Sequence, residues 1–169
     1  MRTLWALLGV VLLAGTAAAG ATNLVADGSV GYRQADLSWD LDSGAAVNGA
    51  VFEIWTSNQS LLNASAPEVH STFLIGSTEG LVQPEPGAWY DDCSRTANGV
   101  EAPVHRLDNG TAVLPEGTTA VTCTLTGLAA ESEVHLAVWT IGPDGGTNLS
   151  ESVRVTTSIA DVLATPLDT

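Results

Sequence analysis

The stretch from Ala120 to Thr157 constrains the fold of this chain more than any other part of its sequence. Three segments in it alternate apolar and polar residues, and a short connection at 126–128 and a Gly/Pro/Asp-rich turn at 142–146 separate them. Side chains of a β-strand point to opposite faces in turn, so this period of two is typical of half-buried strands. The stretch therefore predicts an all-β domain.

The same alternation predicts further strands toward the N-terminus. In Val51–Ser57, Phe52 and Ile54 take one face and Trp55 the other, while Asn58–His70 is expected to be a polar loop. The complete set of expected strands lies within 22–27 and at 33–41, 51–57, 71–77, 118–125, 133–141 and 151–158.

Two short motifs resemble those of the fibronectin type III family. Leu37-Ser38-Trp39 resembles the end of the family's second strand, and the run from Leu125-Thr126-Gly127-Leu128 through the following two strands resembles its last three strands. The resemblance covers residues 22–77 and 118–158. It implies an immunoglobulin-like, fibronectin type III-like β-sandwich of about seven antiparallel strands, with Trp39 in the core. The chain departs from the family at Val134, where a tyrosine is usual.

An insertion separates the two matching parts. Members of the family cross from the expected strand at 71–77 to the next strand in a few residues, whereas this chain spends residues 78–117 there. Connections of that length are usually functional or are tied down. The sequence thus predicts one domain at 22–158 that carries this insertion, followed by a C-terminal tail at 159–169.

Residues 1–21 have the pattern of a secretory signal peptide. Arg2 precedes an apolar run from Leu4 to Gly15, and small residues offer cleavage after Ala19 or Ala21. An uncleaved N-terminal anchor is the alternative. Cleavage would place the mature protein outside the cell or on its surface, with no membrane insertion after the signal peptide is removed.

The charge of the chain excludes one class of partner. Five basic residues, none of them lysine, stand against 19 acidic residues, which gives a formal net charge of −14. Such a surface repels phosphates, so nucleic acid and anionic lipid are not expected partners.

Both cysteines and four sequons fit an extracellular protein. Cys93 and Cys123 are the only cysteines, and a disulfide between them would stabilise the fold by roughly 3–4 kcal/mol. The N-x-S/T glycosylation sequons all fall in expected loops, at Asn58, Asn63, Asn109 and Asn148.

An aromatic patch is the first candidate binding site. If strands 51–57 and 133–141 are neighbours, Trp55 and Trp139 lie on the face opposite the core, with His135 beside them. Aromatic side chains on one sheet face suit protein or sugar binding. Trp89 and Tyr90, in the insertion, join this candidate set. The alternative is that the insertion covers the patch as a second, smaller core.

An aspartate cluster is the second candidate. Loops expected at one end of the sandwich carry carboxylates that could together bind Ca²⁺, which takes six to eight oxygen ligands. The alternative is a set of ordinary turn aspartates. The candidate ligands are Asp40, Asp42, Asp91, Asp92 and Asp144.

Catalytic motifs are absent from the sequence. It has no G-x-S-x-G or H-E-x-x-H motif, and its histidines at 70, 105 and 135 lack metal-ligand spacing. Apart from calcium at the aspartates, no cofactor is predicted. The expected function is an interaction or structural module without catalytic activity, bound to an extracellular protein or glycan. The alternative is a carbohydrate-binding or calcium-dependent accessory module of a surface layer or a separate enzyme.

Overall fold

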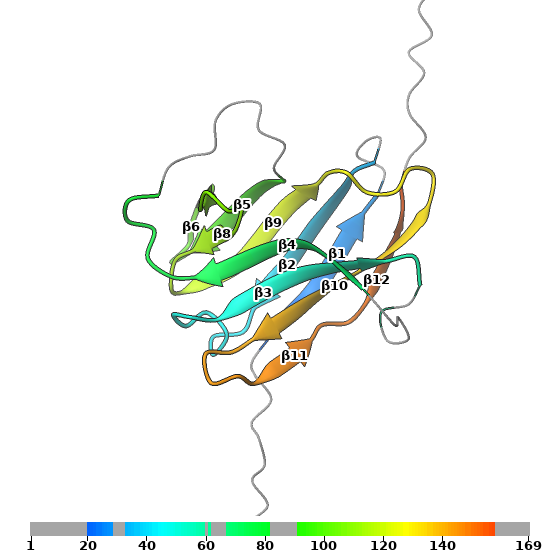
Figure 1. Ribbon diagram of the computed structural model, residues 1–169. Helices are drawn as coiled ribbons and strands as arrows, with labels where there is room; N and C mark the ends of the chain where they lie inside the picture. The colour runs from blue at the N-terminus through cyan, green and yellow to red at the C-terminus, as the bar shows by residue number, and fades with distance from the viewer. Residues whose placement is uncertain (1–19, 29–32, 60, 62–66, 82–90, 158–169) are drawn as a thin grey trace, which may run out of the picture.

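A computed structural model of the chain describes residues 20–28, 33–59, 61, 67–81 and 91–157 (Figure 1). The secondary structure of these residues is β-strand only, arranged in two sheets. Figure 1 shows β3 and β4 of one sheet crossing in front of β1 and β2 of the other. In the described part of the chain, no helix is long and apolar enough to span a membrane.

The first sheet has five strands in the order β1-β2-β9-β5-β6. Its strands are β1 (Ala21–Asp27), β2 (Ala35–Leu41), β9 (Thr118–Leu125), β5 (Asp92–Ala97) and β6 (Val100–Pro103). The second sheet has the order β11-β10-β3-β4-β8-β7, and β12 also pairs with β10. Its strands are β11 (Thr147–Leu149), β10 (Glu133–Ile141), β3 (Val51–Ser57), β4 (Glu68–Ile75), β8 (Ala112–Leu114), β7 (His105–Arg106) and β12 (Val153–Thr156).

One apolar core joins the two sheets. Trp39 of β2 meets Phe73 of β4 edge to face, with ring centroids 5.4 Å apart and an interplanar angle of 77°. Phe52 and Ile54 of β3 are fully buried in the same cluster. Buried aromatic pairs contribute about 0.5–1.5 kcal/mol beyond their area burial. The prediction that Trp39 lies in the core is confirmed.

Most predicted strands are found, with corrections at three places. The predicted bounds of β3, β9 and β10 are confirmed. The strand expected at 71–77 begins earlier, at Glu68, so His70 belongs to a strand and not to a loop. Part of the connection before the last predicted strand forms β11. Twelve strands, and not about seven, lie in the described part, and the pairing of β4 with β8 is parallel.

The described part of the insertion is built into both sheets. β5 pairs with β9 and β6 with β5, whereas β8 pairs with β4 and β7 with β8. Asn98 and Gly99, with φ of 51° and 75°, form the two-residue turn between β5 and β6. Positive φ at both positions matches the twist of a hairpin. These four strands of the insertion therefore satisfy their backbone hydrogen bonds by widening both sheets.

The predicted disulfide is confirmed. Cys93 and Cys123 face each other across β5 and β9, with their Cα atoms 4.1 Å apart. The bond fastens the insertion to the first sheet. The predicted tail at 159–169 and nearly all of the predicted signal peptide at 1–21 lie outside the described residues.

Candidate functional site

Two neighbouring tryptophans lie on the outer face of the second sheet. Trp55 of β3 and Trp139 of β10 are stacked, with ring centroids 4.9 Å apart and an interplanar angle of 16°. Their strands are hydrogen-bonded neighbours, and the intervening residues of each strand point into the core. Both indoles are half-buried. The predicted pairing of these two side chains on one face is thus present in the structure.

Neighbouring side chains fix the tryptophan pair. The indole Nε1 of Trp55 donates a 2.8 Å hydrogen bond to Oε2 of Glu53. Ala137, directly opposite Trp55 in the register and two residues before Trp139, is fully buried although it belongs to the outer face. A side chain as small as alanine leaves room for the two rings above it. The half-buried apolar residues around the pair are Val51, Leu74, Ile141 and Leu149.

His135 shares the face of the tryptophan pair. Its Nε2 lies 3.1 Å from Oε1 of Glu133, whose Oε2 is 3.3 Å from Nη1 of Arg154. This end of the face is therefore polar and partly acidic. Trp89 and Tyr90, the other two aromatic candidates, lie outside the described residues.

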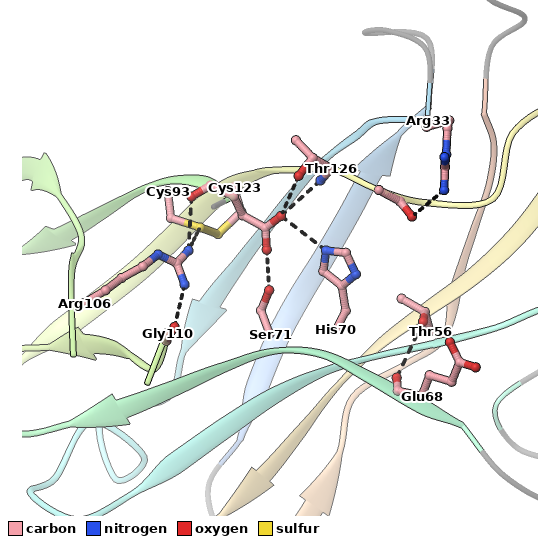
Figure 2. Close-up of polar contacts among 12 residues, drawn as sticks. Arg33, Thr56, Glu68, His70, Ser71, Cys93, Arg106, Gly110, Cys123 and Thr126 are labelled. Atoms are coloured by element: carbon pink, nitrogen blue, oxygen red, sulfur yellow. Dashed lines mark hydrogen bonds and ion pairs between the residues drawn. A yellow bond between two sulfur atoms is a disulfide. The ribbon is translucent and has the colours of Figure 1, made fainter. Parts of the chain in front are cut away.

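A second site surrounds Asp91, just before β5. Figure 2 shows Ser71 and His70 of β4, together with Thr126 after β9, reaching toward one carboxylate. Ser71 donates its hydroxyl to Oδ2 of Asp91, and the Thr126 amide donates a 3.0 Å hydrogen bond to Oδ1. Nε2 of His70 lies 3.2 Å from the same Oδ1. The carboxylate thus ties β4 of the second sheet to the end of β9 in the first.

The pKa of Asp91 reflects two opposing effects. Burial raises it, because a buried carboxylate loses hydration, and the side chain is only 7% exposed. Hydrogen bonds from His70, Ser71 and Thr126, and the electrostatic attraction of His70, lower it and prevail. The pKa of Asp91 is therefore held below its ordinary value of 3.8.

Arg106 of β7 is a buried neighbour of this site. Its guanidinium donates 3.0 Å hydrogen bonds to the carbonyl oxygens of Gly110 and Asp91 and lies 3.7 Å from Sγ of Cys93 (Figure 2). The disulfide, the β7–β8 connection and Asp91 are thereby connected through one buried cation.

A pocket of about 840 Å³ opens beside Asp91, His70 and Arg106. Volumes of about 300–1,000 Å³ are usual for small-molecule sites. Most of the lining residues have polar side chains, among them Asn109 and Thr111, although apolar atoms form the larger part of the lined surface. Of these residues, sequence reasoning singled out Asp91 as a metal ligand and Asn109 as a sequon, but the pocket itself was missed. His70 was assigned to a loop, so no pattern placed it opposite Asp91.

The Ser71, His70 and Asp91 side chains do not have the order of a hydrolytic triad. In such a triad the histidine lies between the hydroxyl and the carboxylate, so that it can take the hydroxyl proton. Here the carboxylate lies between the other two groups, and Ser71 donates its proton directly to Asp91. The geometry holds two sheets together and leaves the hydroxyl oxygen unactivated by histidine.

The predicted aspartate cluster does not assemble in the described residues. Asp40 and Asp42, at the end of β2, accept hydrogen bonds from Asn23 and from the amide of Gly20. Asp91 lies near Thr126, beside the opposite end of β2, because Ala35 pairs with Leu125.

Within the described residues, the two remaining aspartates do not join a metal-ligating group either. Asp92 pairs with Thr124 of β9, and Asp144 accepts a hydrogen bond from the Gly146 amide within its own turn. The described residues contain no group of three or more metal-ligating side chains.

Three of the four sequon asparagines are described. Asn58 and Asn109 are exposed, after β3 and between β7 and β8 respectively. Asn148 is half-buried within β11, which corrects its assignment to a loop. Asn63 lies outside the described residues.

Comparison with protein-family models finds no match to this chain, and none of the curated proteins matches it.

Proposed function

We propose that this chain is a secreted, fibronectin type III-like β-sandwich that binds an extracellular partner protein through the Trp55/Trp139 face and has no catalytic activity. The observation that carries the proposal is the stacked tryptophan pair, half-buried on the outer face of a sheet. Tryptophans supply large contact areas at little entropic cost and dominate the energetics of many interfaces.

The strand order supports the fibronectin type III-like part of the proposal. In immunoglobulin constant-type domains the fourth strand joins the sheet of the first and second strands. Here β4 pairs with β3 in the second sheet, while β1, β2 and β9 are consecutive neighbours in the first. The disulfide supports an exported location, because such bonds persist in oxidising compartments.

Charge defines the kind of partner. Glu53 accepts the hydrogen bond of the Trp55 indole, Glu133 lies at the His135 end of the same face, and the whole chain has a net charge of −14. A partner with an apolar centre and a rim of lysine and arginine would complement this surface. Steering by such charges weakens as salt screens them.

The proposal is tested with arrays of immobilised extracellular proteins and of glycans, probed with the mature protein at low and high salt. The expected result is a protein ligand whose binding falls at least about ten-fold in Trp55→Ala/Trp139→Ala, since interface tryptophans are frequent hot spots. Val25→Ala is the matched control, because Val25 is an exposed apolar residue of β1 in the other sheet. Binding that is equally strong in the tryptophan variant would overturn the proposal.

Glycan binding by the same face is the second candidate function, and the half-buried, stacked aromatic rings favour it. A glycan that binds the wild type and is lost in Trp55→Ala would replace the protein partner with a sugar. A calcium-dependent binding function would require that a chelator abolish the binding. Turnover of a substrate that Asp91→Asn or His105→Ala abolishes would contradict the absence of catalytic activity.

A further inference from the structure

The Asp91 pocket concentrates positive charge in an acidic protein. The chain has 5 basic and 19 acidic residues, yet among the described residues two arginines and a single carboxylate, Asp91, line this pocket. Asp91 already accepts hydrogen bonds at both of its oxygens, from Ser71 and from Thr126. Its negative charge is therefore stabilised by the fold itself, and Arg33 and Arg106 give the pocket an excess of positive charge.

Arg33 is held in place at the rim of the pocket. Its Nε donates a 2.7 Å hydrogen bond to the carbonyl of Leu128, and Nη2 lies 3.3 Å from the carbonyl of Gly127. The Leu128 amide in turn donates to the carbonyl of Arg33. Within the described residues these partners of the guanidinium are neutral carbonyls, so its charge meets no carboxylate there.

The backbone of Arg33 is in the left-handed region, with φ of 56°. This conformation costs an ordinary residue roughly 1–2 kcal/mol. Residues kept in such conformations cluster at binding sites, where the surrounding structure fixes them. The contacts with Leu128 and Gly127 provide that fixation and orient the guanidinium before any ligand arrives.

The rest of the lining suits a ligand with many hydroxyl groups. Gln34, Thr72, Asn109 and Thr111 supply amide and hydroxyl groups that both donate and accept hydrogen bonds. An adjoining hollow shares His70 and Gly127 with the pocket but is lined by Glu68 and Glu133. A ligand carboxylate would be repelled from those two glutamates and directed toward Arg33.

We propose that the pocket between Arg33, His70 and Arg106 binds a carboxylate-bearing sugar of the uronic acid class. Arg33 receives the carboxylate, because a guanidinium pairs with it through two parallel hydrogen bonds. The amide and hydroxyl side chains of the lining receive the sugar hydroxyls. This site is separate from the Trp55/Trp139 face and does not depend on the partner proposed for that face.

The test is a titration of the ¹⁵N-labelled mature protein with galacturonate, galactose and acetate, followed by amide chemical shifts. Galacturonate should give saturable shifts at Gly110, Thr111 and Gly127. Galactose lacks the carboxylate and acetate lacks the sugar hydroxyls, so each should bind at least about ten-fold more weakly than galacturonate. Galactose or acetate binding as tightly as galacturonate would overturn the proposal, as would shifts confined to Trp55 and Trp139.

Two arginine variants locate the carboxylate contact. Arg33→Gln should weaken galacturonate binding at least about ten-fold, whereas Arg154→Gln, an exposed arginine of β12 outside the pocket, should leave it unchanged. Arg33→Lys is a second variant that keeps the positive charge. Near-ultraviolet circular dichroism of both Arg33 variants shows whether they are folded. Arg33→Lys should bind more tightly than Arg33→Gln. Wild-type affinity in a folded Arg33→Gln protein would contradict the proposal.

Discussion

Ser71 and Asp91 join the two sheets through one hydrogen bond, in which a β4 hydroxyl donates to a carboxylate just before β5. The same carboxylate accepts the amide of Thr126. The buried Asp91 carboxylate stabilises the fold only if these hydrogen-bond donors are present. Without the carboxylate, the Ser71 hydroxyl and the Thr126 amide would lose their acceptor.

Asp91→Asn should therefore lower the free energy of unfolding by about 2 kcal/mol, because an amide replaces one acceptor oxygen with a donor that faces existing donors. Urea titration measures this change. Asp92→Asn is the matched control, since Asp92 is exposed, and it should shift stability by less than about 0.5 kcal/mol. An equal change in the free energy of unfolding in both variants would show that the Asp91 hydrogen bonds do not stabilise the fold.

The lowered pKa of Asp91 predicts a dependence of stability on pH. A carboxyl group with a folded-state pKa below its unfolded value of 3.8 stabilises the protein above that pH, and this contribution is lost as the pH falls through the folded-state pKa. The stability difference between wild type and Asp91→Asn should thus be fully present at about pH 5 and shrink below about pH 4. A difference that stays constant down to about pH 2 would contradict this assignment.

Acrylamide quenching of fluorescence should detect the exposure of the tryptophan pair. Trp55 and Trp139 are half-buried, whereas Trp39 is 1% exposed. Trp55→Phe and Trp139→Phe should each remove a readily quenched component of the emission, and Trp39→Phe should remove a protected one. If all three variants lose only protected emission, another part of the protein covers the pair and the proposed binding face is closed.

The β5–β6 turn should depend on Gly99. Its φ is 75°, and no atom lies within 4 Å of the position that a Cβ would take. Gly99→Ala should therefore destabilise the protein by about 1 kcal/mol through backbone conformation alone. Gly76→Ala is the control, because Gly76 lacks a positive φ and its added Cβ would meet its nearest atom at 3.8 Å. A thermal melt compares the two, and equal midpoints would contradict the prediction.

The strands that sequence reasoning placed well are those that bury one face. Phe52 and Ile54 of β3, and Leu136 and Val138 of β10, occupy the core at alternate positions. A one-residue shift would expose all of them, so the alternation specifies both the strand and its inward face. The stacking of Trp55 on Trp139 follows from the same parity once β3 and β10 are neighbours.

The strands of the insertion are harder to predict from sequence because they are short. β5 to β8 span two to six residues each, too few for a clear alternation. One usable signal was present, since Asn98-Gly99 is a typical two-residue hairpin turn. Recognising it would have placed β5 and β6 on either side and put Cys93 in a strand.

The sequence alone determined the all-β class, the inward faces of the long strands and the pairing of the two cysteines. Alternation is visible within each strand, and a chain with two cysteines allows only one disulfide. Tertiary structure decided which polar side chains meet. His70, Asp91 and Arg33 are distant in sequence, and the joining of the insertion to both sheet edges brings them to one pocket. The same arrangement separates Asp91 from Asp42, since backbone pairing, and not charge, sets the end of the sheet at which each residue lies.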